Sequence, residues 1–519
     1  MQIKYLYNTL RHLKIKQVLY QVRYRLFKPK YKLFSIEVKE PQLKLVGSIA
    51  KNCCFDGDVF DFLNISSKFT SWNDASNGML WAYNLNYMDY LFQDNMSLED
   101  GSKWIDKFIA DLQANKVGLD PYPIALRGIN WIKFISKYGA DVPNDKLEQW
   151  NNSLYSQYKL LEKKLEYHLL GNHLLEDAYS LFIASIYFSD EKMYLKSSKL
   201  LRNELNEQIL ADGAHYEQSP MYHCILLDRL LDCCNVSFNN IRFDSQVNIN
   251  VFLREKTSQM LGHLSSIIYK DQTIPLLNDS ANGIAPTPSD LFDYANRLSI
   301  EWEKIPMGDC GYRKMSSKRL ECILDIGDIK ASYQPGHSHA DTFNYELRID
   351  DVPFIVDTGI STYNKNERRQ YERSTLAHNT VSVEGRDSSE VWGGFRVARR
   401  AKVKILKEKD SYISAVHDGY GKNCLHYRTF DLNEKNFEVV DQLSTNVSAV
   451  NLIHFAPNVV IESVKNDVIV TNIAEIHICG VNSVEVEDEM VSTEYNKFES
   501  IKVLKMYFSK EMKYNIVMR

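Results

Sequence analysis

Two histidines, His337 and His339, stand two residues apart in the C-terminal half of this 519-residue chain. They precede an alternating run, Phe343 to Ile349, whose period of two predicts a β-strand. Asp357 follows the next apolar run, and His378 opens a third. Such residues at the ends of neighbouring strands could converge, and two imidazoles with a carboxylate suit zinc. The alternative is that each is an ordinary polar residue at a strand end.

A second group of polar residues lies far upstream. Asn172, His173 and Glu176 fall within about one helical turn and lead into an amphipathic run that ends at Phe188. Some forty residues later, Tyr222 and its neighbour His223 begin another apolar run. Two helices carrying these side chains could face a common cleft, although polar residues at helix ends more often serve as caps.

Taken together, these segments resemble the heparinase II/III family of polysaccharide lyases. The resemblance rests on the order and spacing of several motifs rather than on any one of them, and it covers roughly residues 60 to 510. The motifs are Asn172-His173 with Glu176, Glu217 to His223, Gly336 to Asp341, Val356 to Gly359, and Ala377 to Thr380.

The resemblance implies an α+β multidomain fold, with an N-terminal incomplete (α/α) toroid followed by a C-terminal antiparallel β-sandwich. It also implies cleavage of a uronate polysaccharide by β-elimination. In that chemistry Asn172, helped by His173, would bind the uronate carboxylate. Tyr222 would protonate the departing O4 or, for one configuration at C5, act as both base and acid. For a uronate of the opposite C5 configuration, His337 would be the base that removes the C5 proton.

The resemblance further implies one divalent metal held by His339, Asp357 and His378, a ligand set that favours zinc. Its role would be structural, fixing the edge of the β-domain against the toroid so that His337 reaches the cleft. Glu176 would contact the substrate or support a group that does. Some related lyases have arginine at that position, so the binding of the carboxylate is the part of the site that the resemblance defines least.

Substrate contacts are also expected from a basic and aromatic stretch in the second half. Arg373, Trp392 and Arg396 offer bidentate guanidinium donors and a face on which a sugar ring can stack. With Glu176 and Glu217 they form the predicted substrate-binding set. The alternative is a solvated strand face with ordinary ion pairs.

The chain divides by pattern into three parts. Residues 1–59 form a basic extension, residues 60–305 carry helical periodicity, and residues 312–519 show short alternating runs typical of an antiparallel sandwich. Consecutive amphipathic helices without a fixed repeat suggest paired helices in a solenoid or a toroid, and the resemblance selects the toroid.

The net charge of −5 argues against general attraction of polyanions, so an acidic glycan needs a local basic surface. We expect no nucleic-acid partner, because no binding module of that kind is recognisable. The nine cysteines, which include the adjacent pairs Cys53-Cys54 and Cys233-Cys234, form neither a disulfide framework nor a CxxC zinc motif. Reduced thiols are expected.

The N-terminal stretch has no recognisable signal peptide and no apolar run of membrane-spanning length. We therefore expect a location in the cytoplasm or at the cytoplasmic face of a membrane. A basic amphipathic helix from Ile3 to Phe27 could lie on a membrane surface. The alternative is a solvated helix packed on the domain.

Three functions remain open from the sequence. A lyase and a uronate C5-epimerase begin with the same proton abstraction and can share this architecture. A non-catalytic glycan-binding protein is the third possibility, against which the complete set of Asn172, Tyr222 and His337 argues. A glycosidase using Glu176, Glu217 or Asp279 is less favoured, because nothing pairs those carboxylates.

Overall fold

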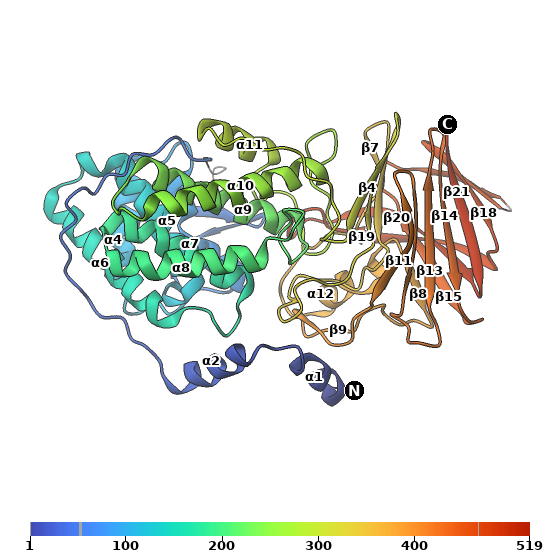
Figure 1. Cartoon of the computed structure of the whole chain (residues 1–519), viewed down its shortest axis with the longest axis horizontal. Helices are drawn as coiled ribbons and strands as arrows, with labels where there is room; N and C mark the ends of the chain where they lie inside the picture. The colour runs from blue at the N-terminus through green and yellow to red at the C-terminus, as the bar shows by residue number, and fades with distance from the viewer. Residues whose placement is uncertain (1, 51–53, 466) are drawn as a thin grey trace.

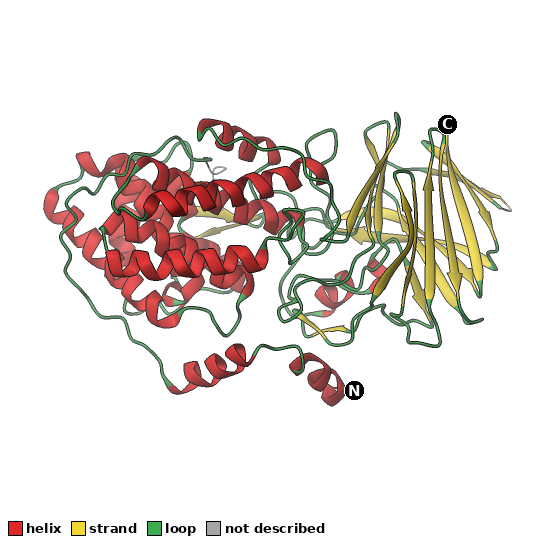
Figure 2. Ribbon diagram, viewed as in Figure 1, coloured by secondary structure: helices red, strands yellow, loops and turns green. Residues whose placement is uncertain are grey.

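The computed structural model describes residues 2–50, 54–465 and 467–519, so Cys53 lies outside the described residues. The chain forms a helical half and a β-rich half that lie side by side (Figures 1 and 2). An N-terminal segment runs beneath both. This arrangement is the incomplete (α/α) toroid followed by an antiparallel β-sandwich that the sequence predicted.

The helical half is built around α7, which is apolar on nearly all sides and almost entirely buried. It packs against α5, α8 and α9. The helices are α3 (Met79–Tyr87), α4 (Leu98–Asp111), α5 (Pro121–Tyr138), α6 (Asn144–Lys164), α7 (Gly171–Phe188), α8 (Glu191–Gln208), α9 (Pro220–Asn239), α10 (Gln246–Ile267) and α11 (Pro288–Arg297). Short 3-10 turns occur at Asp89–Phe92, Val117–Leu119 and Gly139–Asp141. Because α7 is central, its N-terminus is rigidly placed where the chain turns toward the β-rich half.

The predicted extension of residues 1–59 is not an independent part of the molecule. Its end contributes β1 (Phe55–Asp56) and β2 (Val59–Phe62), which pair with β3 (Ile65–Lys68) to form a small antiparallel sheet. The predicted boundary at residue 60 therefore falls inside a strand. Phe60, fully buried, joins the core of the helical half.

The N-terminal residues form two helices, α1 (Gln2–Leu10) and α2 (Ile15–Leu26), rather than the single helix predicted from Ile3 to Phe27. The chain then continues in an extended form along the helices. Side chains of α5, α6 and α9 accept its backbone N–H groups, as in the bonds from Phe34 to Ser156 (2.7 Å) and from Val46 to Asn235 (2.9 Å). These side-chain acceptors replace the partner strand that the segment lacks.

The β-rich half stacks antiparallel sheets over an apolar core. Eight strands run in the order β11-β12-β13-β14-β21-β18-β17-β16, and two four-stranded sheets run β19-β20-β15-β8 and β4-β5-β6-β7. A small helix, α12 (Glu367–Glu372), and the 3-10 turn Thr375–Ala377 lie between β7 and β8. Alternating burial along strands such as β13 and β14 reflects one face on the core and one toward solvent.

The strands are β4 (Tyr312–Ser316), β5 (Leu320–Asp325), β6 (Tyr345–Ile349), β7 (Val352–Ile355), β8 (Val381–Val383), β9 (Val391–Trp392), β10 (Arg396–Val397), β11 (Val403–Lys409), β12 (Tyr412–His417), β13 (His426–Leu432), β14 (Asn436–Leu443), β15 (Ala449–His454), β16 (Ile461–Lys465), β17 (Val468–Thr471), β18 (Ala474–Cys479), β19 (Ser483–Val491), β20 (Glu499–Phe508) and β21 (Glu511–Met518).

All eight cysteines within the described ranges are free thiols, in agreement with the expectation of reduced cysteines. Among the described helices, none combines the length and apolar character needed to cross a bilayer.

Two glycines meet back to back where the β-rich half begins. Gly311 precedes β4 with a φ of +90°, and a Cβ built on it would lie 2.4 Å from the Cα of Gly327, just after β5. Both the backbone conformation and the close approach therefore require glycine. Gly308, three residues earlier, has nothing within 4 Å of its Cβ position.

We predict that Gly311→Ala destabilises the protein by roughly 2 kcal/mol or more, because the new methyl group must push the β4 and β5 ends apart. Urea unfolding should show a lower midpoint for this variant, and Gly308→Ala is the matched control with little change. Equal midpoints for the two variants would contradict the packing described.

Candidate active site

Three residues predicted to do chemistry meet where the two halves join. Asn172 lies at the start of α7, Tyr222 in the first turn of α9, and His337 in the loop between β5 and β6. The amide nitrogen of Asn172 lies 3.2 Å from Nε2 of His337, and the rings of Tyr222 and His337 stack with centroids 3.9 Å apart. Residues separated by more than 160 positions in the chain thus share one site.

Glu217 holds Asn172 in place. Its two carboxylate oxygens accept from the backbone N–H of Asn172 (3.0 Å) and from its side-chain amide (2.7 Å). A Cβ on Gly171, whose φ is +60°, would lie 2.5 Å from one of those oxygens. Glycine at 171 therefore lets the carboxylate approach the helix N-terminus, where backbone N–H groups favour a negative charge. Glu217, predicted to bind substrate, is at most 1% exposed and orients Asn172.

His337 is oriented by Asp279, a residue of the loop after α10. Nδ1 of His337 lies 2.8 Å from one oxygen of this carboxylate, and Nε2 of His339 lies 2.8 Å from the other. Because an ionised carboxylate only accepts, we assign the proton of His337 to Nδ1, which leaves Nε2 with a lone pair facing Asn172.

Arg369 of α12 completes this cluster with a bidentate contact to Asp279, one of whose bonds is 2.7 Å long. Burial alone would raise the pKa of Asp279, but the guanidinium and the two histidines lower it well below its usual range. Asp279 is therefore a buried carboxylate of the helical half that binds three side chains of the β-rich half. Sequence reasoning assigned it no such role, because its partners lie at least 58 residues away.

Tyr363, also missed, donates its hydroxyl to that of Tyr222 at 3.2 Å and lies 3.5 Å from Nδ1 of His337. Burial raises the pKa of Tyr222, so its phenol is protonated at neutral pH. The hydroxyl of Tyr222 is held in place by one neighbour and is ready to donate. No short motif in the sequence identifies Tyr363.

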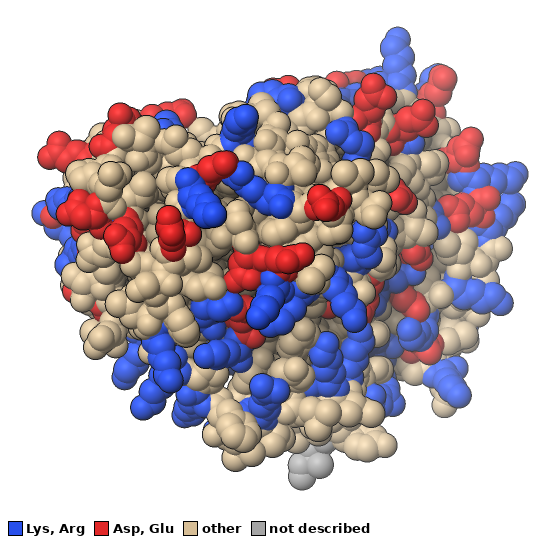
Figure 3. Space-filling model, turned by 60° about the vertical axis from the view of Figure 1, so that its left-hand side comes forward, with Lys and Arg blue, Asp and Glu red and all other residues tan. Residues whose placement is uncertain are grey.

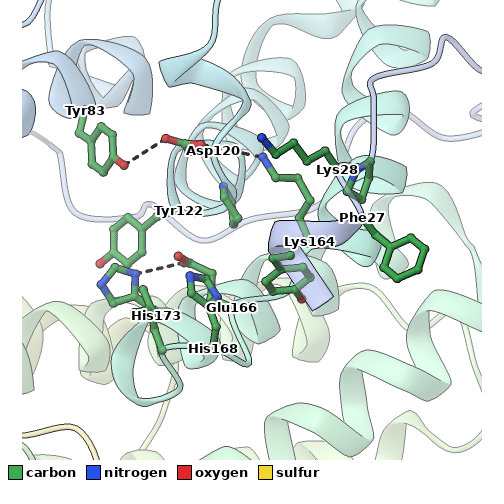
Figure 4. Close-up of a pocket in the computed structure, with 13 residues that line it drawn as sticks. Phe27, Lys28, Tyr83, Asp120, Tyr122, Lys164, Glu166, His168 and His173 are labelled. Carbon is green, nitrogen blue, oxygen red and sulfur yellow. Dashed lines mark hydrogen bonds and ion pairs between the residues drawn. The ribbon is translucent and has the colours of Figure 1, made fainter. Parts of the chain in front are cut away.

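His173 lies on a different side of the α7 terminus from Asn172. Its Nδ1 is 3.1 Å from Glu166, and its ring contacts that of Tyr122 with centroids 4.8 Å apart (Figure 4). Although burial acts in the opposite direction, Glu166 raises the pKa of His173. His173 therefore lies beside a cavity with Glu166 as its partner rather than joining the Asn172–Tyr222–His337 group.

That cavity has a volume of about 470 Å³ and lies against the end of α2. The amines of Lys28 and Lys164 project into it near Asp120, and Tyr122 forms another part of the wall (Figure 4). Two cations and aromatic faces can bind an anionic sugar. His173 lines this cavity, whereas Asn172, Tyr222 and His337 are not among the residues that form its wall.

Two residues predicted to bind substrate are instead fully buried. Glu176 has no exposed surface, and its nearest charged neighbour is Arg229, at 3.8 Å. Arg373 donates to the backbone carbonyl of Ser338 at 2.7 Å and so braces the loop that carries His337. Neither side chain reaches solvent, so the prediction of direct substrate contact by Arg373 is wrong. For Glu176, burial leaves the other predicted role, the support of a group that contacts substrate.

Trp392 and Arg396 lie on the two-stranded ribbon of β9 and β10. The indole N–H of Trp392 donates to Thr9 of α1 at 3.1 Å, and its ring lies 6.2 Å from that of Tyr5. Arg396 stacks over the same indole. The N-terminal helix thus occupies part of the face expected for a sugar, and substrate contact by this pair stays a prediction.

The predicted metal ligands share one buried region. Oδ2 of Asp357 lies 2.8 Å from Nδ1 of His378, and the rings of His339 and His378 are 5.3 Å apart. Nδ1 of His339 and Nε2 of His378 are buried without a hydrogen-bond partner. Unpaired buried imidazole nitrogens beside a carboxylate are donor types that a divalent metal takes, but the donor atoms of these three residues do not all lie within 4.8 Å of one another.

Another trio within the described part of the chain is drawn together more tightly. The donor atoms of Asp212, His263 and Cys310 all lie within 4.8 Å of one another. One oxygen of Asp212 also accepts from the backbone N–H groups of Gly308 (3.0 Å) and Cys310 (2.8 Å). Through these bonds the carboxylate of Asp212 holds in place the segment that links the two halves.

A helical toroid and an antiparallel sandwich that share a Tyr–His–Asn site at their junction define the architecture of polysaccharide lyases of this type. The chain matches "Heparinase II/III N-terminus" over residues 127–295 and "Heparinase II/III-like, C-terminal" over residues 301–513. It belongs to the heparinase II/III family.

The chain is similar to two curated relatives, both heparin-sulfate lyases. That of Bacteroides stercoris is 23% identical over 58% of this chain and 48% of the relative, and that of Pedobacter heparinus is 24% identical over 57% and 47%. The chain thus spans about half the length of the curated relatives it matches.

Solved structures agree on the fold. A heparinase III crystal structure superposes with a TM-score of 0.66 at 14% identity, covering 96% of this chain and 88% of the other. The heparan sulfate lyase HepC of Pedobacter heparinus gives a TM-score of 0.58 at 17% identity, covering 87% and 79%. At sequence identities of 14% and 17%, these superpositions establish that the fold is shared.

We predict that Glu176→Gln flattens the dependence of stability on pH. Burial raises the pKa of Glu176 to about 7, with Arg229 opposing the shift. The folded state then holds a proton that the unfolded state loses near pH 4.5, so stability falls as pH rises from about 4.5 to 7, by about 3 kcal/mol in total.

Glutamine keeps the neutral shape and should remove most of that fall. Urea unfolding at about pH 5 and pH 8 measures it, with Glu148→Gln, an exposed residue of α6, as the control. An unchanged pH slope in Glu176→Gln would contradict the assignment.

Proposed function

We propose that this protein is a polysaccharide lyase that cleaves a uronate-containing polysaccharide by β-elimination. The observation that carries the proposal is the meeting of Asn172, Tyr222 and His337 at the junction of the two halves. Membership of the heparinase II/III family and similarity to two heparin-sulfate lyases support it. The substrate class we favour is an acidic glycosaminoglycan.

The first requirement of the reaction is to stabilise charge on the uronate carboxylate while the C5 proton leaves. Asn172 supplies an amide donor at the N-terminus of α7, where the helix dipole also favours a negative charge. His173, whose pKa Glu166 raises against the opposing effect of burial, lies beside the adjoining cavity. Together they favour binding of an anionic sugar at this end of α7.

The second requirement is a base for C5 and an acid for O4. Nε2 of His337 is left free for a proton because Asp279 binds Nδ1, so His337 can serve as base. The ring of Tyr222 lies against that of His337, and its protonated phenol can deliver a proton to O4. For the opposite C5 configuration, Tyr222 would perform both transfers.

We also propose a structural divalent metal, most favourably zinc, at His339, Asp357 and His378. The unpartnered nitrogens of His339 and His378 support it. When bound, it would supply rigidity at the edge of the β-rich half. His339 then links this cluster to Asp279, and so to the position of His337.

Peripheral contact with a membrane and a location at the cytoplasmic face or in the cytoplasm complete the proposal. The first 36 residues contain nine Lys and Arg side chains and no Asp or Glu. The cytoplasmic leaflet is anionic and attracts such segments. Eight free thiols within the described ranges are compatible with a reducing compartment.

The activity is tested by incubating the protein with a panel of uronate polysaccharides in deuterated water. Ultraviolet absorbance reports the unsaturated product of elimination, and mass spectrometry or NMR reports exchange at C5. Unsaturation supports the lyase proposal. Exchange without cleavage would indicate the C5-epimerase instead, and neither signal over a wide panel would favour a glycan-binding protein.

We predict that Tyr222→Phe lowers kcat by roughly a hundred- to ten-thousand-fold without unfolding the protein, because the change removes the hydroxyl alone. Steady-state kinetics and thermal unfolding measure both effects. Tyr507→Phe, on β20, removes a tyrosine hydroxyl outside the site and is the matched control. Normal turnover in Tyr222→Phe would exclude the phenol from the reaction.

We predict about one tightly bound divalent metal per chain, lost in His378→Ala. Elemental analysis of the purified protein measures it directly, without reference to activity. His477→Ala, an exposed histidine of β18, should retain the metal. Wild-type protein that is active and free of metal would refute the site, and full metal retention in His378→Ala would mean that His378 is not a ligand.

A further inference from the structure

The N-terminal helices present their apolar face to solvent. Along α2, Ile15, Val18, Leu19, Val22 and Leu26 recur at i, i+3, i+4, i+7 and i+11, which places them in one stripe. Their exposed fractions run from 45% for Val18 to 79% for Ile15. An apolar stripe of this kind normally packs against a protein core. Its exposure here marks it as a surface that another molecule binds.

The opposite face of α2 binds the protein through polar and aromatic groups. Gln17 donates to the carbonyl of Leu169 at 3.1 Å, and Tyr24 donates to that of Leu165. Tyr20 packs its ring against that of Tyr167 with centroids 4.7 Å apart. The helix is thus held by its polar side, so the exposure of the apolar side follows from specific contacts.

Helix α1 continues the same surface. Its inward side chains, Tyr5 and Thr9, contact Trp392 in the β-rich half, whereas Leu6, Tyr7 and Leu10 are 45% to 69% exposed. The two helices lie in line along the lower edge of the molecule (Figure 1). They form one exposed apolar surface, which we call the N-terminal apolar surface.

Cations flank this surface. By helical periodicity, Lys16 and Arg23 lie at one edge of the α2 stripe and Arg25 lies at the other. The acidic net charge of the whole chain contrasts with the absence of Asp and Glu from residues 1–36. Figure 3 shows Lys and Arg gathered along the lower part of the molecule, with few acidic side chains among them. Apolar side chains flanked by cations match the chemistry of an anionic bilayer.

The N-terminal apolar surface also adjoins the cavity beside His173. Tyr24, Phe27, Lys28 and Pro29 form part of the cavity wall. Phe27 is 67% exposed and follows the α2 stripe directly, so it belongs to both features. A bilayer in contact with α2 would therefore lie next to the place where an acidic sugar can enter.

We infer that α1 and α2 bind the surface of an anionic membrane and that this docking presents the cavity beside His173 to glycans attached to that membrane. The second half of this inference rests on the proposed lyase function. In this arrangement Lys28 lies close to two kinds of anionic group, the lipid headgroups and the acidic sugar. Membrane docking raises the local concentration of the substrate at the site.

The membrane half is tested with the full chain and two kinds of vesicle, pure phosphatidylcholine and phosphatidylcholine mixed with phosphatidylglycerol. We expect sedimentation with the anionic vesicles, weaker at high salt. The double variant Val18→Ser/Val22→Ser should reduce the partition coefficient roughly tenfold or more.

Val247→Ser/Val251→Ser on α10 is the matched control. These two valines have the same i, i+4 spacing and are 61% and 66% exposed, so this variant should bind as wild type does. Equal binding to neutral vesicles, or an unchanged Val18→Ser/Val22→Ser variant, would overturn the inference. So would self-association that Val18→Ser/Val22→Ser abolishes in light scattering without any vesicle binding, since the occupant would then be a second copy of the chain.

The presentation half is tested with a heparan sulfate oligosaccharide, either free or coupled to a phospholipid in the anionic vesicles. Wild-type protein should cleave the coupled form roughly tenfold faster, and Val18→Ser/Val22→Ser should lose that advantage while cleaving the free form normally. Equal rates for the two proteins on the coupled form would overturn presentation. Absence of cleavage of either form would refute heparan sulfate as the substrate and its presentation by the membrane, whereas vesicle binding alone would uphold the membrane half.

Discussion

The site depends on one buried carboxylate, that of Asp279. It belongs to the helical half, and it binds Arg369, His337 and His339 of the β-rich half. A buried charge without partners is strongly unfavourable, and removing one partner of such a group typically costs about 3–5 kcal/mol. The two halves therefore adopt the relative position in which these bonds form, and that same position brings His337 onto Tyr222 and Asn172.

The groups that we propose to react are held by buried neighbours. Glu217 positions Asn172, and Asp279 positions His337. Arg373 donates to the carbonyl of Ser338 and so stabilises the loop that carries His337. Preorganised donors and acceptors of this kind need no rearrangement as charge develops in a reaction. The cluster of His339, Asp357 and His378 continues the network into the sandwich, where a bound metal would stiffen the same loop from the other side.

The N-terminal helices show a different use of packing. Instead of burying their apolar side chains, they are anchored by Gln17, Tyr20 and Tyr24 and leave the apolar stripe exposed. Turning that stripe toward the domain would move Gln17, Tyr20 and Tyr24 away from the loop before α7, which they now contact. The arrangement places the exposed apolar stripe next to a wall of the cavity beside His173, because both are built from consecutive residues.

Much of the fold was predictable from local patterns and from the family resemblance. Helical periodicity marked residues 60–305, and the alternating run from Phe343 to Ile349 marked β6, because periodicity reflects which face of an element is buried. The break after Arg297 and the start of strands at Tyr312 were equally visible. The single N-terminal helix was wrong, since periodicity alone does not detect the turn at residues 11–14.

What the sequence by itself determined were the residue types able to do chemistry, and the resemblance assigned Asn172, Tyr222 and His337 their roles. Tertiary structure decided the rest, because burial and long-range pairing have no local signature. It turned Glu176 and Arg373 from expected substrate contacts into buried supports. It also revealed Asp279 and Tyr363 as partners of His337. Their positions follow from how the loop after α10 meets the loop between β5 and β6, and that meeting depends on how the two halves of the chain pack together.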